Sequence, residues 1–195
     1  MPTTTVLDGP AWKRLVLLSI LWGGSFFFNG VAVRDLPPLT IVFIRVGLAA
    51  VLLWPALKLA GLRLPSGVAA WWPFVGMGLL NNVIPISLIV TGQTQVAAGM
   101  ASVLNAMTPI FSVLVLAGSG DERLTIPRLA GVACGFAGVV VLRGEVVGAT
   151  SATLGMMLCI AAALSYALAG LWGRRKLAGV PPLVAAAGQL TASGL

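Results

Sequence analysis

Long apolar runs constrain this chain more than any other feature of its sequence. Seven of them lie at about residues 15–33, 39–59, 68–90, 96–117, 126–142, 152–172 and from about 180 onward. A bilayer core about 30 Å thick needs roughly 20 apolar residues at a helical rise of about 1.5 Å, and most of the runs reach that length. Charged residues make up only 9% of the chain. The sequence therefore predicts an all-α integral membrane protein, a multi-span helical bundle.

The positive charges predict how this bundle is oriented. Short cytoplasmic loops carry an excess of Lys and Arg. A cytoplasmic N-terminal tail, residues 1–11, places nine of the twelve basic residues on the inner side: Lys13, Arg14, Lys58, Arg63, Arg123, Arg128, Arg174, Arg175 and Lys176. It places Arg34, Arg45 and Arg143 on the outer side or in a span. Because the basic residues lie between spans and not on one face of a soluble fold, we expect no nucleic-acid partner despite a net charge of +7.

Groups that carry catalysis or bind metals are scarce. The chain has no histidine, and its two cysteines, Cys134 and Cys159, both fall in apolar runs, where a thiol behaves as a small hydrophobe. The spans offer no pair of acids and no serine–histidine pair. We therefore predict no enzyme, no metal and no cofactor. The predicted spans also lack Asp, Glu and His, the usual carriers of a membrane proton relay, so uniport or exchange is at least as well supported as proton coupling.

A weak internal repeat organises the chain. The turn Arg34–Leu39 contains Pro37-Pro38-Leu39, and Pro181-Pro182-Leu183 follows at an offset of 144 residues. At that offset Trp22 aligns with Tyr166 and Arg45 aligns with Gln189. Five spans per unit is an odd number, so the second unit enters the membrane upside down. Such inverted repeats are a recurrent transporter architecture. We predict a first five-helix repeat over residues 12–143 and the incomplete start of a second over 151–195, truncated at about seven spans.

Polar residues inside the spans are candidates for a solute path. Ser19, Trp22, Ser25 and Asn29 recur at steps of three, three and four residues and so share one face of the first span. Such a stripe must avoid lipid, either by packing on another helix or by lining a cavity. Trp22 lies away from the interfacial belt where tryptophan usually gathers. With its repeat counterpart Tyr166 it could form a gate or a stacking platform.

The other candidates come from later spans. Arg45 lies roughly 9 Å into its helix, where it could snorkel to the outer interface or face a cavity and hold an anionic group such as a carboxylate. The asparagines inside the third and fourth spans need polar partners or water, so they could either line the solute path or form hydrogen bonds between helices. The predicted path residues are Trp22, Ser25, Asn29, Arg45, Asn81, Asn105 and Tyr166.

Four motifs, in this order and spacing, resemble a known family. They are Trp22-Gly23-Gly24-Ser25, Leu36-Pro37-Pro38-Leu39 before Arg45, Ala101-Ser102-Val103-Leu104 with Pro109, and Asp121-Glu122-Arg123-Leu124-Thr125 before Gly131 and Gly138. Together they are similar to the EamA-type drug/metabolite transporters. The resemblance implies ten helices in two inverted halves, in the bacterial inner membrane, that export or exchange amino acids, metabolites or drugs.

The functional prediction is a membrane transporter that moves a small-molecule substrate by alternating access, with the lipid bilayer and, potentially, a second copy of the chain as partners. Two alternatives stay open at this point. A truncated membrane remnant that folds but does not transport would share the sequence features. A seven-helix receptor would match the number of spans but would make the 144-residue repeat accidental.

Overall fold

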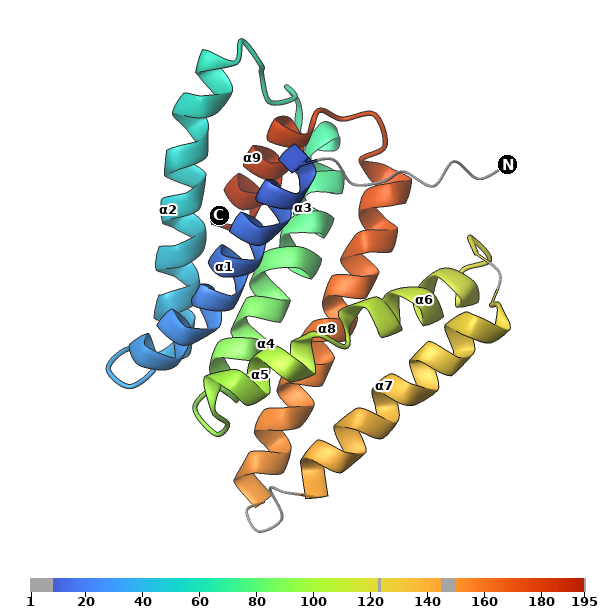
Figure 1. Cartoon of the computed structure of the whole chain (residues 1–195). Coiled ribbons are helices and arrows are strands. Elements are labelled where there is room, and N and C mark those ends of the chain that lie inside the picture. The colour runs from blue at the N-terminus through green and yellow to red at the C-terminus, as the bar shows by residue number, and fades with distance from the viewer. Residues whose placement is uncertain (1–8, 123, 145–149, 195) are drawn as a thin grey trace.

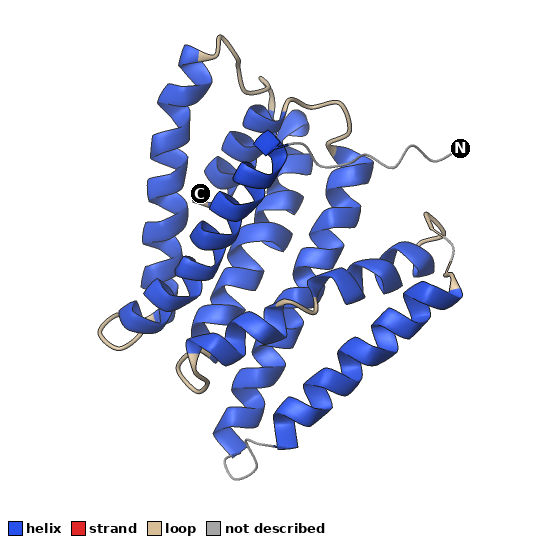
Figure 2. Ribbon diagram, viewed as in Figure 1, coloured by secondary structure: helices blue, strands red, loops and turns tan. Residues whose placement is uncertain are grey.

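A computed structural model describes residues 9–122, 124–144 and 150–194, and these ranges form helices and connecting turns without strands (Figure 2). The helices are α1 (Gly9–Ala32), α2 (Pro38–Leu59), α3 (Trp72–Gly78), α4 (Ile84–Gly92), α5 (Ala98–Asn105), α6 (Thr108–Gly118), α7 (Ile126–Gly144), α8 (Thr150–Lys176) and α9 (Pro182–Ser193). Five stretches of the described chain are long and apolar enough to cross a membrane. The predicted multi-span helical membrane fold is confirmed.

The predicted spans agree with the observed helices to within a few residues, and the largest difference is at the N-terminus. The first helix begins at Gly9 and not near residue 15, so Lys13 and Arg14 lie within α1. Most of the predicted tail, residues 1–8, falls outside the described residues, as does Arg123. The predicted third span consists of α3 and α4, and the predicted fourth consists of α5 and α6.

Successive spans run in opposite directions through the bundle (Figure 1). The end at which α1 begins, here termed the N-terminal end, also holds the α6–α7 turn and the α8–α9 turn. The opposite end holds the α1–α2 turn and the α4–α5 turn. The two proline-containing turns that define the repeat therefore lie at opposite ends, as an inverted repeat requires.

A π-helical turn, Leu79–Val83, joins α3 to α4, and Pro85 explains one unusual contact there. The amide of Ile84 donates to the carbonyl of Leu79, five residues earlier. By the same spacing, the carbonyl of Leu80 would accept from the amide of residue 85. Proline has no amide hydrogen. The hydroxyl of Ser165 on α8 donates to the Leu80 carbonyl instead, at 2.8 Å. A buried side chain of one helix thus satisfies a carbonyl freed in another.

Pro109 accounts for the break between α5 and α6 in the same way. Residue 109 cannot donate to the carbonyl of Asn105, four residues earlier. The hydroxyl of Thr108 donates to that carbonyl at 2.7 Å. Figure 1 shows the bend at this point of the fourth span.

Helix α8 lies at the centre of the described bundle and packs against α3, α4, α5 and α6. Its buried positions carry small side chains: Cys159, Ala162, Ala163, Ala167 and Ala169. Small residues let helix backbones approach closely, which is the main source of helix association in lipid. The closest approach is to α4, where a Cβ on Gly155 would lie 2.9 Å from the carbonyl oxygen of Gly92.

Helix α9 packs against α2 and α3. Side-chain hydrogen bonds attach it to the π-helical turn, since Asn81 donates to Gln189 at 3.2 Å and Asn82 donates to Ser193 at 3.1 Å. These contacts fix the start of the second predicted repeat against the middle of the first.

Candidate functional site

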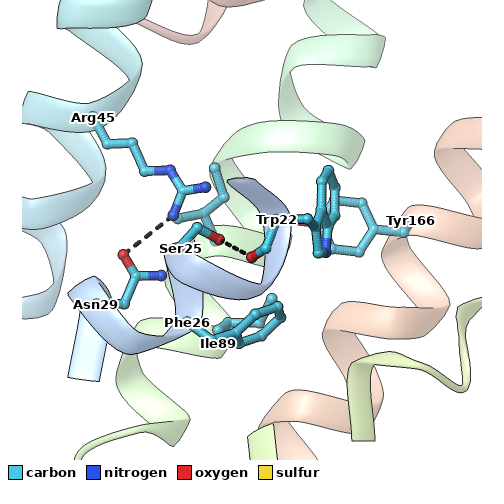
Figure 3. Close-up of a pocket in the computed structure, with 8 residues that line it drawn as sticks. Trp22, Ser25, Phe26, Asn29, Arg45, Ile89 and Tyr166 are labelled. Carbon is cyan, nitrogen blue, oxygen red and sulfur yellow. Dashed lines mark hydrogen bonds between the residues drawn. The ribbon is translucent and has the colours of Figure 1, made fainter. Parts of the chain in front are cut away.

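The aromatic pair predicted from the repeat is in direct contact. Trp22 lies near the middle of α1 and Tyr166 near the middle of α8, and their ring centroids are 6.0 Å apart with a tilt of 57° between the planes (Figure 3). Tilted aromatic pairs at this separation attract each other through their ring quadrupoles. A residue and its counterpart touch only near the axis that relates two copies, so this contact lies where the axis of the predicted inverted repeat would pass.

A guanidinium–amide pair lies beside the aromatic pair. The Nη1 atom of Arg45 on α2 donates to Oδ1 of Asn29 on α1, at 3.1 Å (Figure 3). Asn29 is buried, with 7% of its surface exposed. The side chain of Arg45 thus reaches toward α1. Of the described carboxylates, none is paired with this guanidinium.

These residues line one small cavity. Trp22, Ser25, Phe26 and Asn29 come from α1, Arg45 from α2, Ile86 and Ile89 from α4, and Tyr166 from α8. The cavity measures about 20 Å³, which is room for about one water molecule. Little free space therefore remains between these side chains, although Trp22 and Arg45 are themselves partly exposed.

A larger groove begins on the other side of the same polar residues. Ser25, Asn29 and Arg45 also border a groove of about 620 Å³ between α1 and α2. Its remaining lining is mostly apolar and includes Ile20, Leu21, Phe28, Ile41 and Ile44. Ser25 turns its hydroxyl to its own helix, donating to the carbonyl of Trp22 at 2.8 Å. The amide of Asn29 and the guanidinium of Arg45 are thus the polar boundary between the cavity and the groove.

Two predicted path residues lie apart from this cavity. Asn81 is bonded to Gln189, so it takes the predicted role in joining helices. Asn105 is buried, and its Oδ1 atom has no hydrogen-bond partner in the described structure. Neither residue belongs to the lining that joins Trp22 to Arg45.

Sequence reasoning missed several residues next to the cavity. Phe26, Ile86 and Ile89 are apolar residues in apolar spans, and nothing in the sequence separates them from residues that face lipid. Gln93 was also missed. Its Nε2 atom donates to the carbonyl of Phe26 at 2.8 Å and so attaches the α4–α5 turn to α1 directly beside the cavity. Its position at the end of an apolar run was the only available signal.

Across the described ranges, no group of three or more His, Cys, Asp or Glu side chains is arranged to hold a metal ion. The arrangement offers a cation, an amide and two aromatic faces from three spans. Such a set can bind and orient a solute through charge, hydrogen bonds and stacking. The fold and this site define the class: a multi-span helical membrane protein with a polar site inside the bundle.

The chain belongs to the EamA-like transporter family, which matches residues 14–144. It is 25% identical over 162 residues to the uncharacterized transporter YoaV of Bacillus subtilis, covering 82% of this chain and 56% of that protein. It is 28% identical over 171 residues to the uncharacterized inner membrane transporter YedA of Escherichia coli K12, covering 85% and 54%. A probable amino-acid metabolite efflux pump of the same strain is 28% identical over 163 residues, covering 82% and 52%.

The chain spans about half the length of the curated relatives it matches. No solved structure gives a significant match. Membership of a transporter family agrees with the predicted family and with the membrane fold.

Proposed function

We propose that this protein transports a small solute across the membrane by alternating access, as an exporter or exchanger of metabolites, amino acids or drug-like compounds. The observation that carries the proposal is the meeting of Trp22, Asn29, Arg45 and Tyr166 around one cavity. They come from three different spans, so a relative movement of those spans would change the cavity.

The charge of the site supports a solute with an anionic group. A guanidinium within a membrane is costly unless it is paired. Arg45 has a neutral amide partner in Asn29, and a planar guanidinium is well suited to a carboxylate. The aromatic pair offers an apolar face to the rest of the solute. The relative named a probable amino-acid metabolite efflux pump is compatible with such a substrate.

The size of the cavity supports a conformational cycle. A space for about one water cannot hold a metabolite, so a solute could bind among these residues only after the helices move apart. In the proposed cycle α1 separates from α8, which parts Trp22 from Tyr166 and joins the cavity to the groove between α1 and α2. Asn29 and Arg45 then face the solute.

The proposed orientation has the N-terminal end of the bundle in the cytoplasm. Its support is the positive-inside rule, because this end holds Lys13, Arg14 and the basic residues that close α8. A second copy of the chain remains a proposed partner. The proposed setting is a bacterial inner membrane.

Solute uptake into vesicles that contain the full chain tests the proposal. Labelled amino acids and cationic drugs are compared in vesicles with the parent protein, Trp22→Ala and Arg45→Ala. Phe27→Ala and Arg34→Ala are the matched controls, because neither residue lines the cavity. Loss of uptake in the first two variants with normal membrane levels supports the site. Normal uptake in both would remove Trp22 and Arg45 from it.

A further inference from the structure

A network of ion pairs joins three helices at the N-terminal end of the bundle. Glu122, in the α6–α7 turn, accepts from Nη1 of Arg128 at 2.8 Å and from Nη1 of Arg174 at 3.0 Å. Asp121 accepts from Nε and Nη2 of Arg175, at 3.2 and 3.0 Å. Arg128 lies in α7, and both other arginines lie in the last turn of α8. We name these five residues the end network.

The end network is not the local pairing that the sequence suggested. The sequence led us to expect Asp121 and Glu122 to pair with Arg123 or Arg128. The contact between Glu122 and Arg128 confirms one part of that expectation. The partners on α8, however, are more than 50 residues away in the chain. The acidic pair therefore connects the first predicted repeat with the first helix of the second.

The geometry of the Arg175 contacts is specific. Its guanidinium binds both carboxylate oxygens of Asp121, and its Nη2 atom also donates to the carbonyl of Ser119 at 3.1 Å. A planar guanidinium forms two parallel bonds to a carboxylate in this way, and a lysine cannot. The α6–α7 turn and the end of α8 are thus held in one relative position, not merely attracted by opposite charge.

The end network acts on the helix that carries Tyr166. Arg174 follows Tyr166 by eight residues, or about 12 Å along the helix axis. A rigid helix transmits a displacement at its end to a residue two turns away. The described conformation has both the end network and the contact between Tyr166 and Trp22.

The end network is also suited to repeated opening. All five side chains are partly exposed, so water can replace each contact when the helices separate. Exposed ion pairs are individually weak, but several that share residues form a network with a defined geometry. Buried ion pairs would be much more costly to break.

We propose that Asp121 and Glu122 form an ionic latch, which holds the end of α8 against the α6–α7 turn while the cavity is closed and releases it when the cavity opens toward the N-terminal end. This inference rests on the proposed transport cycle. The latch would hold the end of α8, and the contact between Trp22 and Tyr166 would hold its middle.

The test measures how fast a buried residue behind the latch becomes reactive. Ala169 of α8 is fully buried and lies between Tyr166 and the end network. In the full chain carrying Cys134→Ser and Cys159→Ala, Ala169→Cys is introduced and its reaction with N-ethylmaleimide is followed in membranes. We expect Asp121→Asn and Glu122→Gln each to raise the labelling rate by about two- to fivefold, the range that exposed ion pairs support.

Two further variants separate a latch from a general loss of structure. Asp35→Asn removes an acidic side chain at the opposite end and should leave the rate unchanged. Exchanging the charges, with Asp121→Arg and Arg175→Glu together, should return the rate toward that of the parent. An unchanged rate in Asp121→Asn and Glu122→Gln contradicts the latch. An equal rise of the labelling rate in Asp35→Asn would also contradict it. So would a raised labelling rate that persists in the variant with both Asp121→Arg and Arg175→Glu.

The labelling needs no solute, so its outcome is distinct from that of the transport assay. If the labelling supports the latch but the chain takes up no compound, the latch is supported and the proposed transport function is contradicted. If the chain transports solutes but substitution of Asp121 or Glu122 leaves the labelling rate unchanged, the transport function is supported and the latch is contradicted.

Discussion

Trp22 and Tyr166 are 144 residues apart in the chain, yet their rings lie 6.0 Å apart inside the bundle. They occupy equivalent positions in the two predicted repeats. Their contact joins α1 to α8 at the site that Arg45 and Asn29 also border.

Removing either aromatic ring should impair transport more than folding. A tilted aromatic pair contributes about 0.5–1.5 kcal/mol beyond its buried area, so Trp22→Ala and Tyr166→Ala should each change uptake by roughly two- to tenfold. Tyr166→Phe keeps the ring and should change it little. The measurement is initial uptake rate, normalised to protein in the membrane. If the two changes simply add in the double variant, the rings do not act as a pair.

Arg45 and Asn29 should also behave as a unit. Hydrogen bonds to charged groups contribute about 1.5–3 kcal/mol, so Arg45→Ala should weaken binding of a carboxylate-bearing solute by roughly ten- to a hundredfold. Arg45→Lys keeps the charge but not the planar geometry, so its affinity for the solute should lie between those of the parent protein and Arg45→Ala. Asn29→Ala should weaken binding less than Arg45→Ala. Equal affinities for acids and for their uncharged amides in the parent protein would argue against this role of the guanidinium.

Ser165 should stabilise the protein because Pro85 leaves the Leu80 carbonyl without an amide donor. Hydrogen bonds between membrane helices contribute about 0.6 kcal/mol on average, with larger values near 1.7, so Ser165→Ala should lower the free energy of unfolding within that range. Pro85→Ala restores an amide that can reach Leu80. In that background the loss caused by Ser165→Ala should be smaller. A double-mutant cycle in thermal unfolding measures this difference, and equal losses in both backgrounds would contradict the assignment.

The end network predicts a loss of stability in acid. Hydrogen bonds from Arg175 lower the pKa of Asp121 below its ordinary value of 3.8, and those from Arg174 lower the pKa of Glu122 below 4.5. A carboxylate with a depressed pKa contributes stability above its unfolded-state pKa and loses that contribution as the pH falls through its folded-state pKa. Thermal unfolding should therefore show a loss of stability as the pH falls below about 4.5. This loss should be smaller in the double variant Asp121→Asn with Glu122→Gln. An unaltered pH profile in that double variant would contradict it.

Uniport or exchange, which requires no pH gradient, is at least as well supported by the described spans as proton coupling. The described spans contain no Asp, Glu or His between their ends, so they lack the usual proton carriers. Uptake into vesicles should depend on solute on the opposite side and not on an imposed pH difference. A pH-gradient-dependent uptake that persists in Glu122→Gln would contradict uniport or exchange.

The sequence was sufficient to predict the helices and the aromatic contact. Apolar runs of membrane length identify spans because a bilayer tolerates little else. The repeat paired Trp22 with Tyr166, and an axis between inverted units brings equivalent residues together. Helical spacing placed Ser25 and Asn29 on the same face of α1 as Trp22, and all three line the cavity.

The rest of the cavity could not be predicted, for a physical reason. The lipid tails and the interior of a helical bundle are equally apolar, so the sequence does not show which side of a span faces the interior. This concealed Phe26, Ile86 and Ile89. Long-range hydrogen bonds were concealed as well, because the partner of Gln93 depends on how α1 packs beside the α4–α5 turn. The partner of Asn81, Gln189 of α9, was concealed in the same way.

In the proposed architecture, two related helical blocks cross the membrane in opposite senses and meet at Trp22 and Tyr166. Single cysteines in a background with Cys134→Ser and Cys159→Ala test it most directly, at Leu36 in the α1–α2 turn and at Ala178 in the α8–α9 turn. Both positions are exposed. An impermeant thiol reagent should label Leu36→Cys only from outside the cell and Ala178→Cys only from inside. Labelling of both from the same side would contradict it.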